Sequence, residues 1–304
     1  MESMIIDMHA HIGDLRSPNN LWRKPVTIES LIARLDDEGI EKAAVLPWPA
    51  CPEAVTFPGL FAPECDIVGQ IRSAARHMDR LIPFGNADPR WGGNSSQTDF
   101  SWLLERFVEM GCAGMGEVSA NIYFDDPRTI NLFRQCGQWG LPVTIESCGP
   151  GEGNYGFVDE VGSPHLERLL QKVPETIVVG HGPGFWAEIG ANLRVEEKSG
   201  YPKGAIIEEG SVARLLRTYP NLYADISAFS GYNALTRDEA YGVQFLNEFQ
   251  DRLIFGTDVC FADEEGRTQH LNYLRRLLAE GKIDQEAFEK ITCRNALRIM
   301  KRLK

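Results

Sequence analysis

The sequence has no apolar run long enough to cross a bilayer, and its amino terminus lacks a basic segment followed by an apolar run and a cleavage site. It is also poor in positive charge, because 31 Lys and Arg oppose 43 Asp and Glu among 304 residues, which gives a net charge of −12. Nucleic acids and anionic membranes bind clustered basic side chains, so this deficit argues against both as partners. We expect a cytoplasmic protein with a small-molecule partner, and a homo-oligomer is compatible with these data.

Cysteine is present without the spacing that a structural cysteine site needs. The seven cysteines are an odd number, lie far apart and include no Cys-x-x-Cys pair, so neither a disulfide framework nor a thiolate zinc finger fits. We expect most of them to be small buried residues. Cys148 and Cys260 adjoin predicted strand ends and could line a pocket, although no His–Cys pairing indicates a nucleophile.

No low-complexity tract, charge run or Pro-rich linker divides the chain, so residues 1–304 are expected to form a single domain. Eight short apolar runs alternate with amphipathic segments, and such runs are typical of strands buried on both faces in a parallel sheet. The segment 27–39 is an example of the helices between them, with Leu31 and Leu35 on one face and Gly39 as a C-cap. The other predicted helices are 67–78, 99–110, 128–139, 164–172, 206–218 and 235–248. The fold class predicted from this alternation is α/β, a (β/α)8 TIM barrel with two or three extra helices in 269–304. The eight runs are 4–9, 42–48, 81–87, 112–118, 142–147, 176–181, 222–227 and 253–258.

Two imidazoles recur with period two along the first predicted strand. Side chains two apart on a strand point the same way, so His9 and His11 should converge on one small volume. Imidazole is a common ligand of zinc-like ions, and this pair forms half of a metal site. The alternative is that the two histidines only cap the strand end.

Other ionisable residues also stand at predicted strand ends. Glu117, Glu146, His181 and Asp258 end the fourth, fifth, sixth and eighth runs. In a barrel these ends share one face, and a charged group there loses hydration unless it is paired or bound to a cation. Each residue also has a structural interpretation: Asp258 as a cap, His181 as a core histidine, and Glu117 or Glu146 paired with Arg90 or Arg128.

Five sequence stretches together resemble the amidohydrolase superfamily, and in particular its amidohydrolase-related branch, which includes decarboxylases of the aminocarboxymuconate-semialdehyde type. The resemblance extends over nearly the whole chain and implies a distorted (β/α)8 barrel. The stretches are 6–11 (IDMHAH), 177–182 (IVVGHG), 221–227 (NLYADIS), 253–258 (LIFGTD) and 295–298 (NALR).

The resemblance also implies roles for individual residues. His9, His11 and Asp258 would bind the metal, usually zinc, and His181 would handle water or substrate. At the fifth strand, where related enzymes carry a metal-binding histidine, this chain has Glu146, which is a competent oxygen ligand and makes manganese a second possibility. Glu117 matches a strand-four position that is acidic or a modified lysine in parts of the superfamily.

Two metal-dependent reactions fit these residues. In the first hypothesis the enzyme hydrolyses an amide, ester or lactone, with Asp258 as general base and His181 stabilising the oxyanion or protonating the leaving group. In the alternative it is a lyase that removes carbon dioxide from an unsaturated carboxylic acid, with His181 handling the proton. A third interpretation is a metal-free binding barrel.

The substrate is not named by any motif. The long segments 49–66 and 149–164 follow predicted strands, so both are expected to form walls or lids of the pocket. The candidate substrate-binding residues are one arginine, which could clamp an anion, and four aromatic residues, which could form walls of the pocket. Each of them could equally serve as a rim or packing residue. They are Arg90, Trp91, Trp48, Tyr155 and Trp186.

Overall fold

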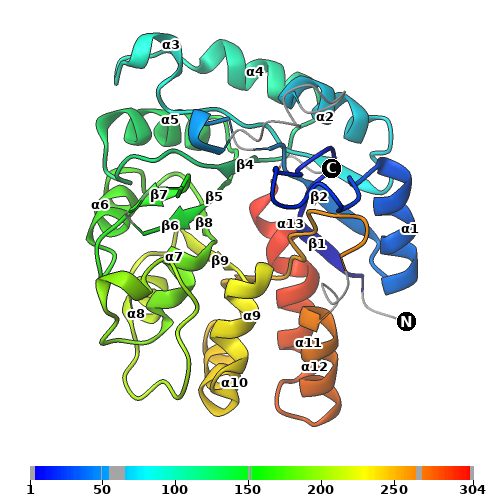
Figure 1. The fold of residues 1–304 in the computed structure, drawn as a ribbon, viewed down its shortest axis with the longest axis vertical. Coiled ribbons are helices and arrows are strands. Elements are labelled where there is room, and N and C mark those ends of the chain that lie inside the picture. Colours follow the sequence, from blue (N-terminus) through cyan, green and yellow to red (C-terminus); the bar gives the residue numbers. More distant parts are fainter. Residues whose placement is uncertain are drawn as a thin grey trace.

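The computed structural model describes residues 4–48, 50–54, 66–149, 151, 153–264 and 269–301. Its centre is a ring of eight short parallel strands surrounded by helices (Figure 1). Each predicted apolar run overlaps one of these strands, so the predicted barrel is confirmed. The strands are β1 (Ile6–Ala10), β2 (Lys42–Val45), β3 (Leu81–Pro83), β4 (Met115–Val118), β5 (Val143–Ile145), β8 (Val178–Gly180), β9 (Leu222–Asp225) and β10 (Leu253–Ile254).

The ring consists of two sheets, and isolated bridges between strands join them at two places. Strands β1, β2 and β3 form one sheet, and β10, β9, β8, β5 and β4 form another. Isolated bridges join Gly85 to Met115 and Ala10 to Val259, while the Met8 amide donates to the Phe255 carbonyl over 3.0 Å. The strands therefore follow one another around a closed barrel.

The barrel is distorted at two of the strands that carry candidate site residues. The register between β1 and β2 shifts between Asp7 and Ala10, and that between β4 and β5 shifts between Met115 and Val118. Such irregularities redirect side chains relative to the regular alternation of a strand. Here the shifts span the positions of His9 and Glu117.

The helices lie outside the ring, and most match the predicted segments. Helix α1 begins after Thr27, which caps it through the Ser30 amide, and ends at Gly39, whose φ of 68° is accessible to glycine without strain. The helices are α1 (Ile28–Glu38), α2 (Ile67–Ala75), α3 (Trp91–Asn94), α4 (Ser101–Glu109), α5 (Pro127–Gln138), α6 (Pro164–Lys172), α7 (Pro183–Trp186), α8 (Ser211–Thr218), α9 (Ala228–Thr236), α10 (Glu239–Glu248), α11 (Gln269–Ala279), α12 (Gln285–Glu289) and α13 (Asn295–Ile299).

Two predicted helices differ from those observed. The segment 206–218 becomes helical only at Ser211, because Glu209 forms an antiparallel bridge with Gly190 and the Gly210 amide donates to Ile189. The segment 235–248 contains the end of α9 and all of α10. Asp238 separates these two helices, since its extended backbone and its carboxylate cap the first turn of α10.

Short elements extend the connections between strands and helices. Strands β6 (Ser147–Cys148) and β7 (Phe157–Val158) form a small parallel sheet within the predicted long loop 149–164 and the residues just before it. Within the described residues, 3₁₀ turns occur at Pro52–Ala54, Ala187–Ile189 and Val195–Glu197, and a π turn occurs at Lys290–Arg294. Of the predicted loop 49–66, residues 49 and 55–65 lie outside the described residues.

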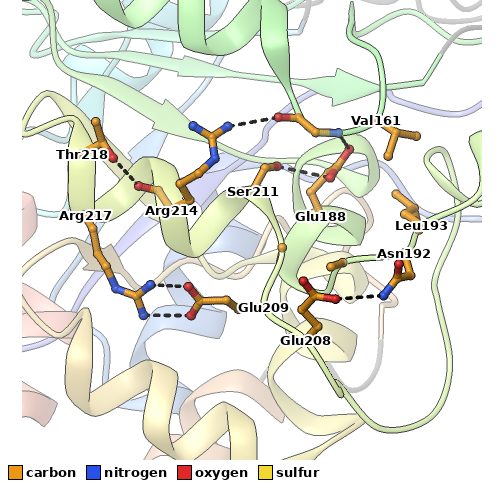
Figure 2. A pocket seen from close by; sticks show the side chains of 13 residues that line it. Val161, Glu188, Asn192, Leu193, Glu208, Glu209, Ser211, Arg214, Arg217 and Thr218 are labelled. Atoms are coloured by element: carbon orange, nitrogen blue, oxygen red, sulfur yellow. Dashed lines mark hydrogen bonds and ion pairs between the residues drawn. The ribbon is translucent and has the colours of Figure 1, made fainter.

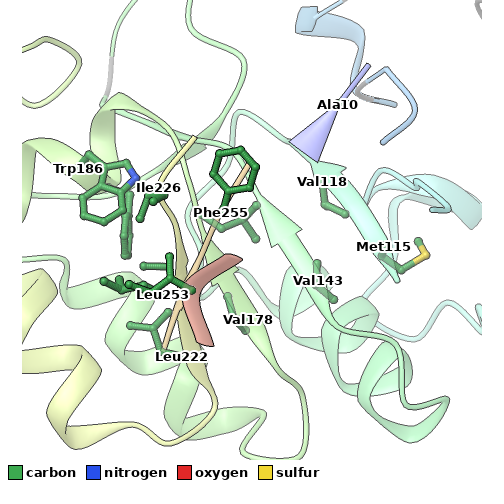
Figure 3. Close-up of a cluster of buried hydrophobic side chains, with 14 of the residues drawn as sticks. Ala10, Met115, Val118, Val143, Val178, Trp186, Leu222, Ile226, Leu253 and Phe255 are labelled. Atoms are coloured by element: carbon green, nitrogen blue, oxygen red, sulfur yellow. The ribbon is translucent and has the colours of Figure 1, made fainter. Parts of the chain in front are cut away.

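Apolar side chains fill the space between the strands and the helices. Figure 3 shows the main cluster, in which Val143, Val178, Leu222 and Leu253 from four successive strands pack together. A second cluster joins alternate strand residues to the carboxy-terminal helix α13, which thereby becomes part of the core. In the part of the chain that the structure describes, no helix combines the length and apolarity that a bilayer crossing requires.

Candidate metal centre and active site

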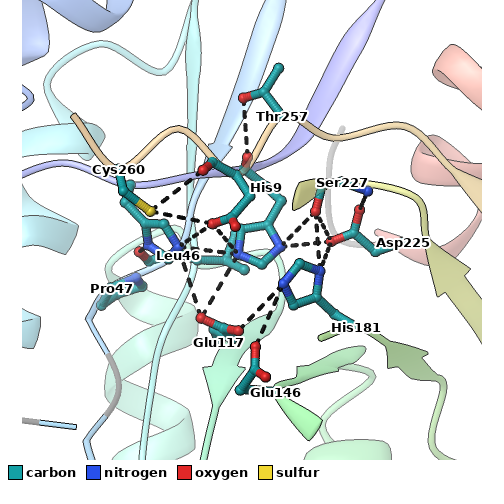
Figure 4. Close-up of polar contacts among 12 residues, drawn as sticks. His9, Leu46, Pro47, Glu117, Glu146, His181, Asp225, Ser227, Thr257 and Cys260 are labelled. Carbon is teal, nitrogen blue, oxygen red and sulfur yellow. Dashed lines mark hydrogen bonds and ion pairs between the residues drawn. The ribbon is translucent and has the colours of Figure 1, made fainter. Parts of the chain in front are cut away.

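The candidate site lies where the strands end at one face of the barrel (Figure 4). The side chains of six residues that the sequence predicts as site residues come together there. They are all buried except Asp258, whose side chain is 15% exposed and faces a cavity. The six residues are His9 in β1, His11 just after it, Glu117 in β4, Glu146 after β5, His181 after β8 and Asp258 after β10.

The protons of His9 and His11 are directed away from each other. His9 Nδ1 lies 2.6 Å from Asp225 Oδ2, and His11 Nδ1 lies 2.9 Å from the Leu46 carbonyl oxygen. Both partners accept hydrogen bonds, so each Nδ1 carries a proton and each Nε2 is left with a lone pair. The two Nε2 atoms are 3.2 Å apart and face each other.

Opposed lone pairs at this distance repel unless a proton or a cation lies between them. Asp258 Oδ1 lies 3.2 Å from His11 Nε2 and 3.6 Å from His9 Nε2, while Glu117 Oε2 lies 3.9 Å from both nitrogens. Although burial opposes protonation, the hydrogen bond and charge of Asp258 raise the pKa of His11. Two imidazoles and two carboxylates around one point form a donor set that fits a divalent metal ion, which would replace this proton.

A second group of donors adjoins the first. His181 Nε2 lies 3.7 Å from Glu117 Oε1 and 3.6 Å from Glu146 Oε2. Burial and the charge of Glu146 raise the pKa of Glu117, and burial raises the pKa of Glu146 to about 7. The two glutamates therefore favour sharing a proton or binding a cation over carrying two uncompensated charges.

Asp225 is the site residue that the sequence reasoning missed. Its Oδ2 contacts the Nδ1 atoms of both His9 (2.6 Å) and His181 (3.0 Å), and Ser227 donates to it through Oγ over 2.7 Å. Burial opposes its ionisation, but the hydrogen bonds from the two histidines prevail and hold its pKa well below the usual value. Asp225 ends an apolar strand like the residues that were selected, and this signal could have identified it.

Glycines at two positions allow these groups to approach one another. A Cβ at Gly182, where φ is 93°, would lie 2.3 Å from Glu146 Oε1. A Cβ at Gly256 would lie 2.9 Å from His9 Cβ and 3.0 Å from Asp225 Oδ1. Larger residues here would displace the candidate ligands.

Two adjoining cavities open onto the candidate metal ligands. One, of about 140 Å³, is bordered by His11, Glu117 and Asp258, and the other, of about 200 Å³, extends towards Asn154 and Tyr201. Glu146, Tyr155, His181 and Asp258 line both. No lysine or arginine is among the described residues that line either cavity.

The five predicted substrate-binding residues separate into two groups. Trp48 and Tyr155 line the smaller cavity, whereas the structure gives the other three different surroundings. Arg90 pairs with Glu53 and Asp88. Trp91 begins the short helix α3 and is 38% exposed.

Trp186 requires a correction. It was predicted as a pocket wall, but it is only 2% exposed and packs against Phe185 and Phe245 in the core. Its indole N–H donates to the Asp225 carbonyl over 2.8 Å. Trp186 follows the strand-end His181 closely, and the sequence does not indicate whether its side chain points to the pocket or to the surrounding helices.

A larger cavity, of about 530 Å³, lies away from these donors, between α8 and the segments around Val161 and Asn192 (Figure 2). Its charged residues are paired with their neighbours. Arg217 forms a two-point ion pair with Glu209, and Arg214 donates to the Gly162 carbonyl. Among the described residues that line it there is no histidine, so it does not resemble the candidate site.

Comparison with solved structures shows the same barrel at low sequence identity. A dihydroxybenzoic acid decarboxylase from a Polaromonas species has a TM-score of 0.62 at 16% identity, covering 99% of this chain and 97% of that chain. A 5-carboxyvanillate decarboxylase from Sphingomonas paucimobilis has a TM-score of 0.60 at 14% identity, covering 99% of both chains. A probable 2-pyrone-4,6-dicarboxylic acid hydrolase from Acinetobacter baumannii has a TM-score of 0.59 at 14% identity, covering 98% and 99%.

Comparison with known sequences gives the family. None of the curated proteins matches the chain. The Amidohydrolase family model, in contrast, matches residues 6–302, which is nearly the whole length. The chain therefore belongs to the Amidohydrolase family and is an enzyme of the amidohydrolase superfamily.

Proposed function

We propose that this enzyme is a metal-dependent decarboxylase of a small aromatic or otherwise unsaturated carboxylic acid. The observation that carries the proposal is the pair of Nε2 atoms of His9 and His11, which face each other at 3.2 Å beside the Asp258 carboxylate. His9, His11, Asp258 and Glu117 would hold a divalent ion. Such an ion would supply Lewis acidity and an anchor for the oxygen atoms of an acidic substrate.

The similar structures favour decarboxylation over the hydrolysis expected first from the sequence. The Polaromonas decarboxylase contains manganese and the inhibitor 2-nitroresorcinol, and a 5-carboxyvanillate decarboxylase from Novosphingobium aromaticivorans also contains manganese. Trp48 and Tyr155 provide flat apolar walls suited to a ring or a conjugated chain. The described residues that line the two cavities include no lysine or arginine, so a bound cation would have to supply much of the charge that neutralises a carboxylate substrate.

His181 is suited to deliver the proton that the reaction requires. Decarboxylation breaks the bond between carbon and carboxylate, releases carbon dioxide and leaves an electron pair on carbon, which a proton must join. Asp225 and Ser227 hold His181 at Nδ1, which leaves Nε2 to face the cavity. Although burial disfavours its charge, the hydrogen bond that Nδ1 donates to Asp225 prevails and raises the pKa of His181 to about 9, so His181 carries a proton at neutral pH in the metal-free protein.

The test is to strip the protein with a chelator, reload it with zinc or manganese, and incubate it with carboxyl-labelled 2,6-dihydroxybenzoate and 5-carboxyvanillate as probes. We expect labelled carbon dioxide from the reloaded enzyme only. His181→Gln should lower the rate at least about 100-fold, in the range of general acid catalysis. His165→Gln is the matched control, because His165 pairs with Asp125 away from the site.

Hydrolysis is the second candidate, favoured by the similarity to the probable 2-pyrone-4,6-dicarboxylic acid hydrolase. In that reaction Asp258, which borders both cavities, would take a proton from water. The two reactions differ in their products. Incorporation of ¹⁸O from water into an opened lactone without release of carbon dioxide would support hydrolysis and contradict decarboxylation.

A further inference from the structure

Cys260 lies beside the candidate metal ligands and lines the smaller cavity. Its backbone is fixed on both sides, since the His11 amide donates to the Val259 carbonyl over 3.1 Å and the Cys260 amide donates to the Glu264 carboxylate over 3.0 Å. These contacts do not depend on an ion. The thiol is therefore held at this place by the fold itself.

The sulfur lies among atoms that already form the candidate metal site. Cys260 Sγ is 3.5 Å from Asp258 Oδ1. One donor atom each from His11, Asp258 and Cys260 lie within 4.8 Å of one another. Figure 4 shows Cys260 on the same side of the cluster as Pro47 and away from His181 and Asp225.

The distances agree with a shared tetrahedral ion. With bonds of about 2.3 Å to sulfur and about 2.0–2.1 Å to nitrogen or oxygen, neighbouring donors of tetrahedral zinc are about 3.3–3.6 Å apart. The observed separations are 3.5 Å between Sγ and Asp258 Oδ1, and 3.2 Å between His11 Nε2 and Asp258 Oδ1. The opposed lone pairs of His9 and His11 are an independent sign that a cation belongs at this point.

We propose that Cys260 Sγ is a ligand of the metal ion and that it makes the site prefer zinc to manganese. On binding, a sulfur–metal bond forms and the thiol proton passes to solvent, with no change in oxidation state. Thiolate favours zinc, whereas a site of carboxylates and water suits manganese. The inference rests on the proposed function only in that the site must bind a divalent ion.

The direct test is the absorption spectrum of the cobalt-substituted protein. The full chain is stripped with a chelator and titrated with Co²⁺ alone. One equivalent should produce an intense near-ultraviolet charge-transfer band from thiolate to cobalt. Cys260→Ser should remove this band, whereas Cys148→Ser should retain it, because Cys148 lines only the neighbouring cavity and its sulfur accepts the Gly156 amide.

The outcomes separate the inference from the proposed function. If the wild-type protein binds one equivalent of cobalt without the band, Cys260 is not a ligand, and the decarboxylase proposal is unaffected. If the protein binds no cobalt, both proposals fail. If Cys148→Ser also removes the band, the thiolate is not Cys260 alone and the inference is overturned.

Two further measurements do not depend on the spectrum. In competition between zinc and manganese, Cys260→Ser should reduce the preference for zinc at least about tenfold, and an unchanged preference would contradict the inference. Should this variant fail to fold, the wild-type chain gives the answer by itself. Zinc should slow the alkylation of Cys260 by iodoacetamide, and peptide mass spectrometry measures the rate. Equal rates with and without zinc would overturn the proposal.

Discussion

Asp225 Oδ2 lies 2.6 Å from His9 Nδ1, so the carboxylate at the end of β9 fixes which nitrogen of His9 faces the metal donors. The same oxygen orients His181. A carboxylate behind a metal-binding histidine sets its orientation and increases its basicity. Asp225 thus links the candidate metal site to the candidate proton donor.

Asp225→Asn should weaken zinc binding by about 10–100-fold, because the amide lacks the charge that makes His9 a stronger donor. The affinity can be measured by competition with a chromophoric chelator. Asp238→Asn is the control, since Asp238 caps α10 and asparagine serves equally well as a cap. Equal zinc affinities for the wild-type protein and Asp225→Asn would contradict a role for Asp225 in metal binding.

Tyr155→Ala should raise the KM of the substrate about tenfold with a smaller effect on kcat, because Tyr155 lines both cavities and does not stand among the donors. Steady-state kinetics with the acid identified by the decarboxylation assay measures this change. Tyr123→Ala is the control, as Tyr123 is 46% exposed and stacks on His165. A KM that responds equally to both changes would indicate a general loss of structure.

Lys198→Met should lower the free energy of unfolding by about 3–5 kcal/mol, because it leaves Glu188 buried without its cation. The two side chains are 1% and 3% exposed and their charged atoms lie 2.6 Å apart. Chemical denaturation measures the change. Replacing both residues, as Lys198→Met with Glu188→Leu, should recover much of the loss, and a double variant as unstable as Lys198→Met would argue against an unpaired charge as the cause.

The stability of the protein should depend on pH through Asp7. Burial raises the pKa of Asp7 to about 7, although Thr257 and the His9 amide donate hydrogen bonds to it. The folded state therefore binds a proton more tightly than the unfolded chain. This contribution to stability is complete below the unfolded pKa of 3.8 and is lost as pH rises towards about 7.

Asp7→Asn should remove this dependence and stabilise the protein at pH 7 and above relative to wild type. The measurement is the free energy of unfolding of the metal-free protein between pH 5 and pH 8. Asp284→Asn provides a comparison, since Asp284 caps α12 at the surface. A wild-type profile parallel to that of Asp7→Asn would show that Asp7 does not titrate in this range.

Local sequence patterns were sufficient to predict the elements of the barrel. Strands buried on both faces are nearly continuous in apolar residues, and α1 carries its own capping signals in Thr27 and Gly39. The antiparallel bridge between Gly190 and Glu209 was not predictable in this way, since pairing across twenty residues leaves no local period. For the same reason the start of α8 was placed too early.

The sequence by itself determined the barrel and the set of strand-end residues from which a site could be built, because periodicity and the cost of burying a charge are local properties. Only the tertiary structure decided how these residues meet. It brought Asp225 behind His9 and His181, turned Trp186 into the core, and set Cys260 beside Asp258. These outcomes depend on the closure of the ring, which involves contacts between residues far apart in the chain.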